Sequence, residues 1–438
     1  MTTAVHRSDL IVAPALQVTV SRIPAADPLA LFARRGGQDG VFWAQPSEGR
    51  AFAGIGAAAV FSADGPDGVQ RAAHWWHAVL DGADVQAEAG APAAPFCLGG
   101  VAFDPLRPVD AHWRPFGGAR FVVPAIAIVV EGETAWLVIS RAGQSVSASA
   151  DLWTQQLAKS GNATAAECVA DDAAEFRAGV RQAVEEIERG CFDKLVLARQ
   201  VVYARRSGFD PVSALSRLRA DYPSCTSFAL AVGTTVFLGA TPERLVRLTG
   251  RTLWTMCLAG SAPRGRDPES DRRHAAALLA DSKERREHGF VVAAMRNALA
   301  PLCRELEIPE SPVVATLPNV HHLKTPITGW LRPGETILSV VEQLHPSPAV
   351  GASPPEAALP ALRRYEAFNR GWFAAPVGWL DRDGGEFVVA LRSALISGNE
   401  ARLFAGCGIV AESDPDRELR ETELKLMPMR SALEVAGP

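Results

Sequence analysis

The sequence lacks the cysteine pattern of a disulfide-stabilised or zinc-binding protein. Its seven cysteines are odd in number, lie scattered along the chain and form no C-x-x-C motif. This usage is typical of reduced thiols rather than of a disulfide framework. The opening residues, MTTAVHRSDL, also lack the apolar core of a signal peptide. We therefore expect a cytoplasmic protein.

Long hydrophobic runs and an excess of positive charge are absent as well. No apolar stretch approaches the roughly 20 residues that a membrane-spanning helix needs. The formal net charge is −5, and the densest basic stretch, PRGRDPESDRRH, is interleaved with acidic residues. Such a stretch is typical of a solvated surface and not of a phosphate-binding patch. We expect neither a membrane nor a nucleic-acid partner.

What is present is an ordinary globular composition, with 48% hydrophobic and 21% charged residues in a chain of 438. Strand-like runs with hairpin spacing, and a few long helices, predict an α+β fold with large, mostly antiparallel sheets. Residues 1–165 are weakly patterned; their clearest element is a hairpin over 124–140 that turns at Glu131-Gly132. Residues 166–438 carry the recognisable chemistry. We expect both parts to belong to one structural domain.

Four further elements are predicted within residues 166–438. An apolar stripe with a terminal glycine predicts a helix over 174–190, and a strand follows from 193. A long charged helix is predicted over 268–305. Asp414-Pro415, a capping residue followed by proline, predicts the start of a final helix.

Two pairs of glutamates stand on these last two helices. Glu284 and Glu287 are three residues apart, and so are Glu418 and Glu421. This spacing places both carboxylates of a pair on one helix face. Four carboxylates from two helices can hold a hard cation such as Mg²⁺. Taken alone, either pair is more typical of a solvated, charged helix face than of a metal site.

Two other motifs are discounted. Residues 54–59, GIGAAA, resemble a dinucleotide fingerprint but lack the strand–helix frame and the acidic residue that should follow. His74 and His77 have helical spacing but no third ligand, so we expect surface or core residues.

Three ionisable residues lie at or beside predicted strands: Lys194 at a strand start, Glu243 at a strand end, and Arg392 inside the apolar run FVVALRSAL. Burying a charge alone is costly, so such residues are usually paired or functional. A structural ion pair for Arg392 and a surface-directed side chain for Lys194 remain alternatives. A base role requires neutral lysine, and lowering its pKa from about 10.4 to about 7 costs roughly 4–5 kcal/mol.

A larger set of motifs resembles the chorismate-utilising enzymes, a family that includes isochorismate, salicylate, anthranilate and aminodeoxychorismate synthases. The resemblance runs in consistent order over roughly residues 175–432. The motifs are KLVLAR, FLGATPERL, LAGSAPRG, DSKERREH, NVHHLKTPITG, LHPSPAVG, ALRSALI, GCGIVAESDP and ETELK. It implies two large antiparallel sheets packed together with helices outside, Mg²⁺ as cofactor and chorismate as substrate. A monomer is the expected state.

The resemblance also implies roles for individual residues. Glu287 and Glu421 resemble metal ligands, and Glu284 and Glu418 resemble supporting carboxylates. Lys194 resembles a base that activates water, and Glu243 an acid that protonates the departing C4 hydroxyl. The residues that resemble the substrate pocket are Ser261, His322, Ala349, Trp372, Arg392, Gly406, Gly408 and Lys425. Trp372 occupies a position that often holds tyrosine.

Two residues discriminate between members of the family. Water-using members carry lysine where this chain has Lys194, whereas anthranilate synthase carries glutamine. Isochorismate synthases tend to have alanine where this chain has Ala349, and salicylate synthases tend to have threonine. The resemblance therefore favours isochorismate synthase, acting in siderophore, salicylate or menaquinone biosynthesis. Salicylate synthase, which goes on to eliminate pyruvate, is the alternative, followed by an aminating enzyme and a non-catalytic relative.

Overall fold

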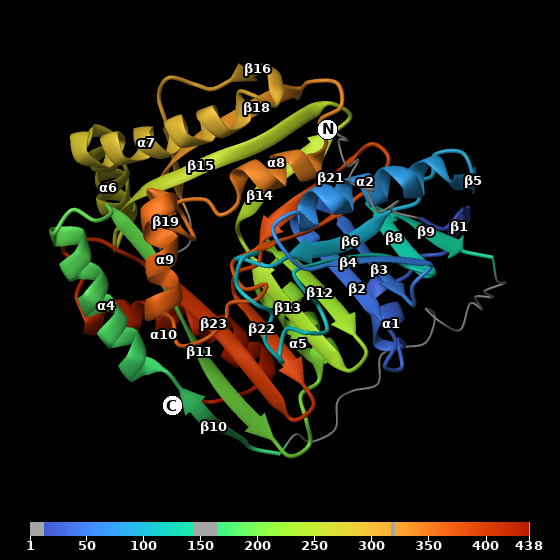
Figure 1. Ribbon diagram of the computed structural model, residues 1–438, viewed down its shortest axis with the longest axis horizontal. Coiled ribbons are helices and arrows are strands. Elements are labelled where there is room, and N and C mark those ends of the chain that lie inside the picture. Colours follow the sequence, from blue (N-terminus) through green and yellow to red (C-terminus); the bar gives the residue numbers. More distant parts are fainter. Residues whose placement is uncertain (1–12, 144–163, 317–319, 438) are drawn as a thin grey trace, which may run out of the picture.

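The computed structural model describes residues 13–143, 164–316 and 320–437. Within them the chain builds two large sheets with helices on their outer surfaces (Figure 1). All strand pairs except β1–β5 are antiparallel within each path. The prediction of a mostly antiparallel α+β fold is confirmed.

The first sheet has 13 strands in the described residues. In spatial order they are β10 (Ala166–Asp171), β11 (Lys194–Arg205), β23 (Glu400–Ile409), β22 (Ser393–Ser397), β13 (Thr235–Thr241), β12 (Thr226–Val232), β2 (Gly40–Gln45), β3 (Arg50–Ile55), β8 (Ile126–Glu131), β9 (Thr134–Arg141), β1 (Leu16–Ile23) and β5 (Ala83–Ala87), with β19 (Ala352–Ser353) beside β11. The hairpin expected over 124–140 is β8 and β9.

The second sheet has ten strands in the described residues. They are β16 (Cys303–Glu307), β18 (Val320–Leu331), β15 (Thr252–Pro263), β14 (Arg244–Thr249), β21 (Gly384–Val389), β20 (Pro376–Leu380), β6 (Cys97–Val101), β7 (Ala119–Val123) and β4 (Ala59–Ala63), with β17 (Val313–Thr316) beside β18. Both sheets thus take strands from residues 1–165 and from residues 166–438.

Alternation along the strands explains why both faces of the first sheet are covered. In β2, Val41 and Trp43 join the core between the sheets, whereas Phe42 and Ala44 join a second core on the outer face. That outer core is closed by three helices: α1 (Pro28–Ala33), α5 (Pro211–Asp221) and α10 (Pro415–Leu433).

The remaining helices cover the second sheet and the edges. They are α2 (Gly68–Asp81), α4 (Ala173–Glu188), α6 (Pro268–Ala280), α7 (Ser282–Leu299), α8 (Ile337–Leu344) and α9 (Pro355–Tyr365). Figure 1 shows α6 and α7 over β15 and β18, with α9 between that layer and β11. Helix α4 confirms the predicted helix over 174–190. No helix in the described ranges is long and apolar enough to cross a membrane.

The segment after α8 is anchored to the N-terminal part of the chain by His345. Its Nε2 lies 3.1 Å from the carbonyl oxygen of Phe103, and the two rings meet edge to face with centroids 5.4 Å apart. Because a carbonyl only accepts, Nε2 carries the donated hydrogen. Burial lowers the pKa of His345 to about 4, further lowered by the charge of Arg370 and opposed by the bond to Phe103.

This buried ring predicts acid sensitivity. A histidine pKa below its ordinary value of 6.5 means that the unfolded chain binds the proton more tightly. The contribution of neutral His345 to the free energy of unfolding is therefore complete above pH 6.5 and is lost as the pH falls toward 4. At about 1.36 kcal/mol per pH unit, the free energy of unfolding falls by about 3 kcal/mol over this range. Urea unfolding at pH 7.5 and 4.5 should show a smaller fall in midpoint for His345→Gln than for the wild type.

The control is His77→Gln, because His77 is an exposed residue on α2. This variant should retain the wild-type fall in midpoint. Identical falls in the wild type and in His345→Gln would contradict the prediction.

Candidate active site

Lys194 is the first residue of β11, where the sequence predicted a strand start. Its backbone pairs with Ser353 of β19, and the neighbouring Asp193 N–H donates to the Ser353 carbonyl at 2.8 Å. The side chain lies against Gly408 of β23, since a Cβ at 408 would come within 2.9 Å of Lys194 Cε. Burial lowers the pKa of Lys194; Glu287 opposes this shift, Lys425 adds to it, and Glu243 opposes it.

Glu243 stands in the turn between β13 and β14. Its N–H donates to Thr241 Oγ1 of β13 at 3.2 Å, and its carbonyl accepts from the Val389 N–H of β21 at 3.0 Å, so β13 and β21 fix the turn. Burial raises the pKa of Glu243, against the positive charges of Arg392, Lys425 and Lys194. Lys194 and Glu243 therefore lie within electrostatic reach of each other and are shifted in opposite directions.

Arg392 does not lie inside a strand, as the apolar run around it predicted. The run is divided between β21 in the second sheet and β22 in the first, and Arg392 lies in the crossover. One continuous strand cannot serve two sheets, so the chain turns here with Arg392 at φ +47°, and its carbonyl accepts from the Ala240 N–H at 3.2 Å. Burial lowers the pKa of the guanidinium, although an arginine remains charged at neutral pH.

Helix α10 brings the second glutamate pair to the same place. Asp414 caps it by accepting from the Arg417 N–H at 2.9 Å, and Pro415 is its first residue, as predicted. Lys425 Nζ lies 2.7 Å from Glu421 Oε1 and donates to the Gly406 carbonyl at 2.8 Å. Glu421 also acts on the pKa of Arg392.

The first glutamate pair is on α7, and the long helix expected over 268–305 is wrong. It divides at Asp281 into α6 and α7, and β16 begins at Cys303. Asp281 has extended backbone angles and accepts from the N–H groups of Lys283 at 2.8 Å and Glu284 at 3.1 Å. A short polar side chain thus competes with the helix and starts a new one, which places Glu284 in a first turn.

The two pairs share one asymmetry. Glu418 is 8% exposed, whereas the side chain of Glu421 is 49% exposed. On α7, Glu284 is partly buried near Gly260, and the side chain of Glu287 is 56% exposed, 4.0 Å from Lys283. In each pair the second glutamate is the one more open to a ligand.

The residues fit a hard cation in their chemistry. All four donors are carboxylates, and no ion pair to a described cation compensates the buried charge of Glu418. A buried carboxylate of this kind favours a nearby positive charge. Among the described residues, however, no three acidic, histidine or cysteine side chains are already drawn together at ligand distance.

His322 and Ser261 are paired residues on β18 and β15. A β-bulge at Gly260 interrupts the pairing there, and His322 Nδ1 lies 3.2 Å from the Gly260 carbonyl. Gly260 has φ +77°, and a Cβ at that position would come within 3.1 Å of Glu284 Oε2. The bulge therefore lies between His322 and the first glutamate pair. The side chain of Ser261 is outside the described part of the structure, so its role stays a prediction.

Trp372 is placed differently from the other predicted pocket residues. Its ring is fully buried, and its N–H donates to the Gly117 carbonyl at 3.0 Å. The structure thus gives it a packing role, with its only polar group already satisfied.

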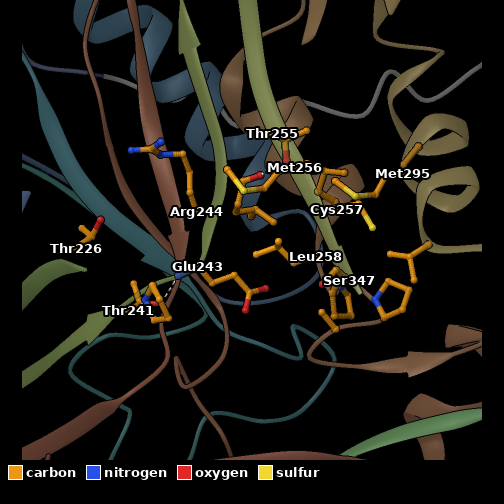
Figure 2. Close-up of a pocket in the computed structure, with 18 of the residues that line it drawn as sticks. Thr226, Thr241, Glu243, Arg244, Thr255, Met256, Cys257, Leu258, Met295 and Ser347 are labelled. Atoms are coloured by element: carbon orange, nitrogen blue, oxygen red, sulfur yellow. Dashed lines mark hydrogen bonds between the residues drawn. The ribbon is translucent and has the colours of Figure 1, made fainter. Parts of the chain in front are cut away.

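A cavity of about 530 Å³ opens on Glu243. Figure 2 shows the Glu243 carboxylate directed among Leu258, Met256 and Ser347. Ala349 is on its wall, but Lys194 and Arg392 are not. The sequence did not single out the other wall residues, which include Thr226, Thr241, Thr255, Met256, Leu258, Val291, Met295 and Ser347. The helical spacing of Val291, Met295 and Ala298 indicates that they share one face of a helix, but it does not indicate that this face lines the cavity.

Comparison with known proteins agrees with this geometry. The family model described as "chorismate binding enzyme" matches residues 6–434. The "salicylate biosynthesis isochorismate synthase" of Pseudomonas aeruginosa is 38% identical, over 99% of this chain and 93% of its own length. Isochorismate synthase MenF of Bacillus subtilis is 35% identical, over 96% of this chain and 94% of its own length.

Solved structures show the same fold. The menaquinone-specific isochorismate synthase MenF of Escherichia coli has a TM-score of 0.78 at 27% identity, covering 96% of this chain and 95% of that one. An isochorismate synthase of Bacillus anthracis has a TM-score of 0.72 at 29% identity, covering 93% and 99%. With the family model spanning nearly its whole length, the chain belongs to the chorismate binding enzyme family.

Proposed function

We propose that this chain is an isochorismate synthase, which isomerises chorismate to isochorismate in a Mg²⁺-dependent reaction. Relatives that match nearly its whole length carry that name. The observation that carries the proposal is the pairing of Lys194 and Glu243. Burial makes the lysine less basic and the carboxyl less acidic, within electrostatic reach of each other. A base and an acid close enough to influence each other's charge are what the exchange of one hydroxyl for another requires.

The proton transfers balance. Neutral Lys194 accepts a proton from water while the water oxygen forms a bond to ring carbon C2. The ring double bond shifts, the C4–O bond breaks, and Glu243 gives its proton to the departing hydroxyl, which leaves as water. Lys194 ends protonated and Glu243 ionised, and solvent restores both.

Substrate carboxylates are held by the cationic side of the site. Arg392 offers a planar fork that suits a carboxylate, and its left-handed backbone aims it from the crossover between the sheets. Gly406 and Gly408 let neighbouring groups approach β23 closely: a Cβ at 406 would meet the Leu197 carbonyl of β11, and one at 408 would meet Lys194. Lys425 and His322 would supply further polar groups, and the pocket role of Ser261 stays as predicted from the sequence. Ala349 lies on the wall of the cavity that opens on Glu243.

Glu287 and Glu421 would hold Mg²⁺ directly, because they are the more exposed member of each pair. Glu284 and Glu418 would orient the ligands and their waters. When bound, the metal supplies positive charge to the ring carboxylate, where charge develops during reaction.

The product requires a downstream enzyme of siderophore, salicylate or menaquinone biosynthesis; the relatives are named for salicylate, 2,3-dihydroxybenzoate and menaquinone. A cytoplasmic location and a monomeric state complete the proposal.

Product identification tests the function. Purified protein incubated with chorismate and Mg²⁺ should accumulate isochorismate without pyruvate, as measured by chromatography. Salicylate and pyruvate in equal amounts would assign a salicylate synthase instead. An ammonia-dependent aromatic amine would assign an aminating enzyme, and unchanged chorismate a non-catalytic relative.

Lys194→Ala should lower kcat by roughly 10²- to 10⁴-fold, the usual contribution of a general base. The KM for chorismate should change far less, because the carboxylate-binding groups remain. Initial rates over a range of chorismate concentrations measure both constants. Intact turnover in this variant would remove Lys194 from the mechanism.

Gly408→Ala provides a matched, milder change. The new Cβ displaces the flexible end of Lys194 and no backbone, so the melting temperature should hold while kcat falls. A misplacement of about 1 Å can cost about 100-fold. A wild-type kcat here would mean that the position of Lys194 is unimportant.

Glu287→Gln should raise the Mg²⁺ concentration needed for half-maximal activity, because a neutral amide is a weaker ligand for a hard cation. Loss of a supporting group typically costs about 10- to 100-fold in metal affinity, and loss of a direct ligand should exceed that. Calorimetric titration with Mg²⁺ gives a second measure that is independent of turnover. Glu284→Gln is the control and should show the smaller change; equal Mg²⁺ dependence in wild type and Glu287→Gln would refute the assignment.

A further inference from the structure

Strand β11, which carries Lys194 at its start, has an interrupted edge. Along one side it pairs with β23 from Leu195 to Ala204. Along the other side, β19 pairs only with Lys194 and Leu195, and β10 pairs only from Val201 onward. The backbone groups of Val196, Ala198 and Gln200 that face this side therefore have no neighbouring strand. Buried backbone groups must still find partners.

Side chains and a loop fill this gap. The Val196 N–H donates to the Gly351 carbonyl at 2.8 Å, and the Gln200 N–H donates to Asp172 Oδ2 at 3.0 Å. Between them, Arg370 Nη2 donates to the Val196 carbonyl at 2.5 Å, and Glu366 Oε1 accepts from the Ala198 N–H at 2.9 Å. Arg370 and Glu366 thus replace the central part of a missing strand.

Arg370 and Glu366 form a buried ion pair, with 2% and 6% exposure. Arg370 Nε lies 3.0 and 2.9 Å from the two carboxylate oxygens of Glu366. The guanidinium also stacks 4.2 Å above the ring of Phe103, the residue whose carbonyl holds His345.

The same guanidinium reaches the loop that carries Ala349. Arg370 Nη1 donates to the carbonyl of Val350, the next residue, at 2.8 Å. One side chain therefore bonds the strand that begins with Lys194 and the loop, residues 346–351, that lines the cavity at Glu243. Neither Arg370 nor Glu366 lines that cavity, so the pair acts on the reaction through other residues.

We propose that the Arg370–Glu366 pair is a positioning element, which fixes Lys194 and the loop at 346–351 relative to each other for attack on the substrate. The inference rests on the proposed function for its kinetic consequence. The groups that hold the substrate carboxylates, Arg392 and Lys425, lie on other elements. Loosening the pair should therefore slow the chemical step with little effect on substrate binding.

Arginine is required at this position because of its geometry. Its planar fork serves Glu366, Val196 and Val350 at once, whereas the single nitrogen of a lysine cannot reach all three from one position. Arg370→Lys therefore keeps the positive charge but breaks the hydrogen bonds that join β11 to the loop at 346–351. Glu366→Gln keeps an oxygen for the Ala198 N–H but removes the negative charge.

The test measures kcat and KM for chorismate in Arg370→Lys and Glu366→Gln. Arg370→Lys should lower kcat by roughly 10- to 100-fold, the cost of a misplaced catalytic group, while KM stays within about threefold. Glu366→Gln should show a smaller loss in kcat. Arg364→Lys is the matched control, since Arg364, in the last turn of α9, makes an exposed ion pair with Glu186 of α4, and it should behave as the wild type.

A wild-type kcat in folded Arg370→Lys overturns the proposal. So does a KM that rises in step with the loss of kcat, because it would place the pair in substrate binding.

A double variant distinguishes a lost positioning role from misfolding. Removing one partner leaves a buried charge alone, but replacing both by apolar residues is often tolerated. Glu366→Leu/Arg370→Met should therefore fold and still show the fall in kcat. If the double variant also loses cooperative unfolding, the pair is a structural element and the positioning role is refuted.

Hydrogen exchange separates this inference from the proposed function. In Arg370→Lys, exchange over the peptide that contains Val196 and Ala198 should quicken, and so should exchange over residues 346–351, whatever product the enzyme makes. Unchanged exchange at both places would refute the positioning role. A wild-type enzyme that forms no isochorismate would refute the proposed function alone.

Discussion

The register between β11 and β23 is the constraint on which the site depends. Ten consecutive residue pairs align Leu195 with Ile409 and Ala204 with Glu400. This alignment places Lys194 over Gly408 and leaves the Gly406 carbonyl to receive Lys425 from α10. A slip of one residue would turn every side chain of one strand to the opposite face. The positions of Lys194, of Gly406 and Gly408, and of the second glutamate pair are thus set by one ladder of hydrogen bonds.

Desolvation then gives the assembled charges their chemical character. The largest influence on Lys194, Glu243 and Arg392 is the same, namely removal from water, and it opposes the charged form of each. Neighbouring opposite charges oppose it, whereas Lys425 adds to it at Lys194. Enclosure thus shifts the pKa of Lys194 down and the pKa of Glu243 up, toward the neutral form of each.

Much of this site could be predicted from sequence because its local signals are strong. Asp414-Pro415 began α10, the apolar stripe ended by Gly190 was α4, and Lys194 opened a strand. The break at Asp281 was missed, because an aspartate within a charged helical pattern looks like any other exposed residue until its side chain caps a new helix. The placement of Arg392 was missed for a different reason: the run FVVALRSALI is apolar on both sides of Arg392-Ser393, and only the positions of the two sheets divide it. Likewise, Glu366 and Arg370 acquire meaning only from the gap in β11, a property of strand order that no local pattern contains.

The place of β22 and β23 in the first sheet has a consequence for how the protein forms during synthesis. These strands come late in the chain, yet they lie between β11 and β13, which are made some 160 to 200 residues earlier. Until they emerge from the ribosome, β11 and β13 each present an unpaired edge, the kind of surface on which other chains can add. Such long-range pairings form slowly, so these two edges stay unpaired until late in synthesis. The two halves of the active site are therefore joined only when the strands at 393–409 are inserted between them.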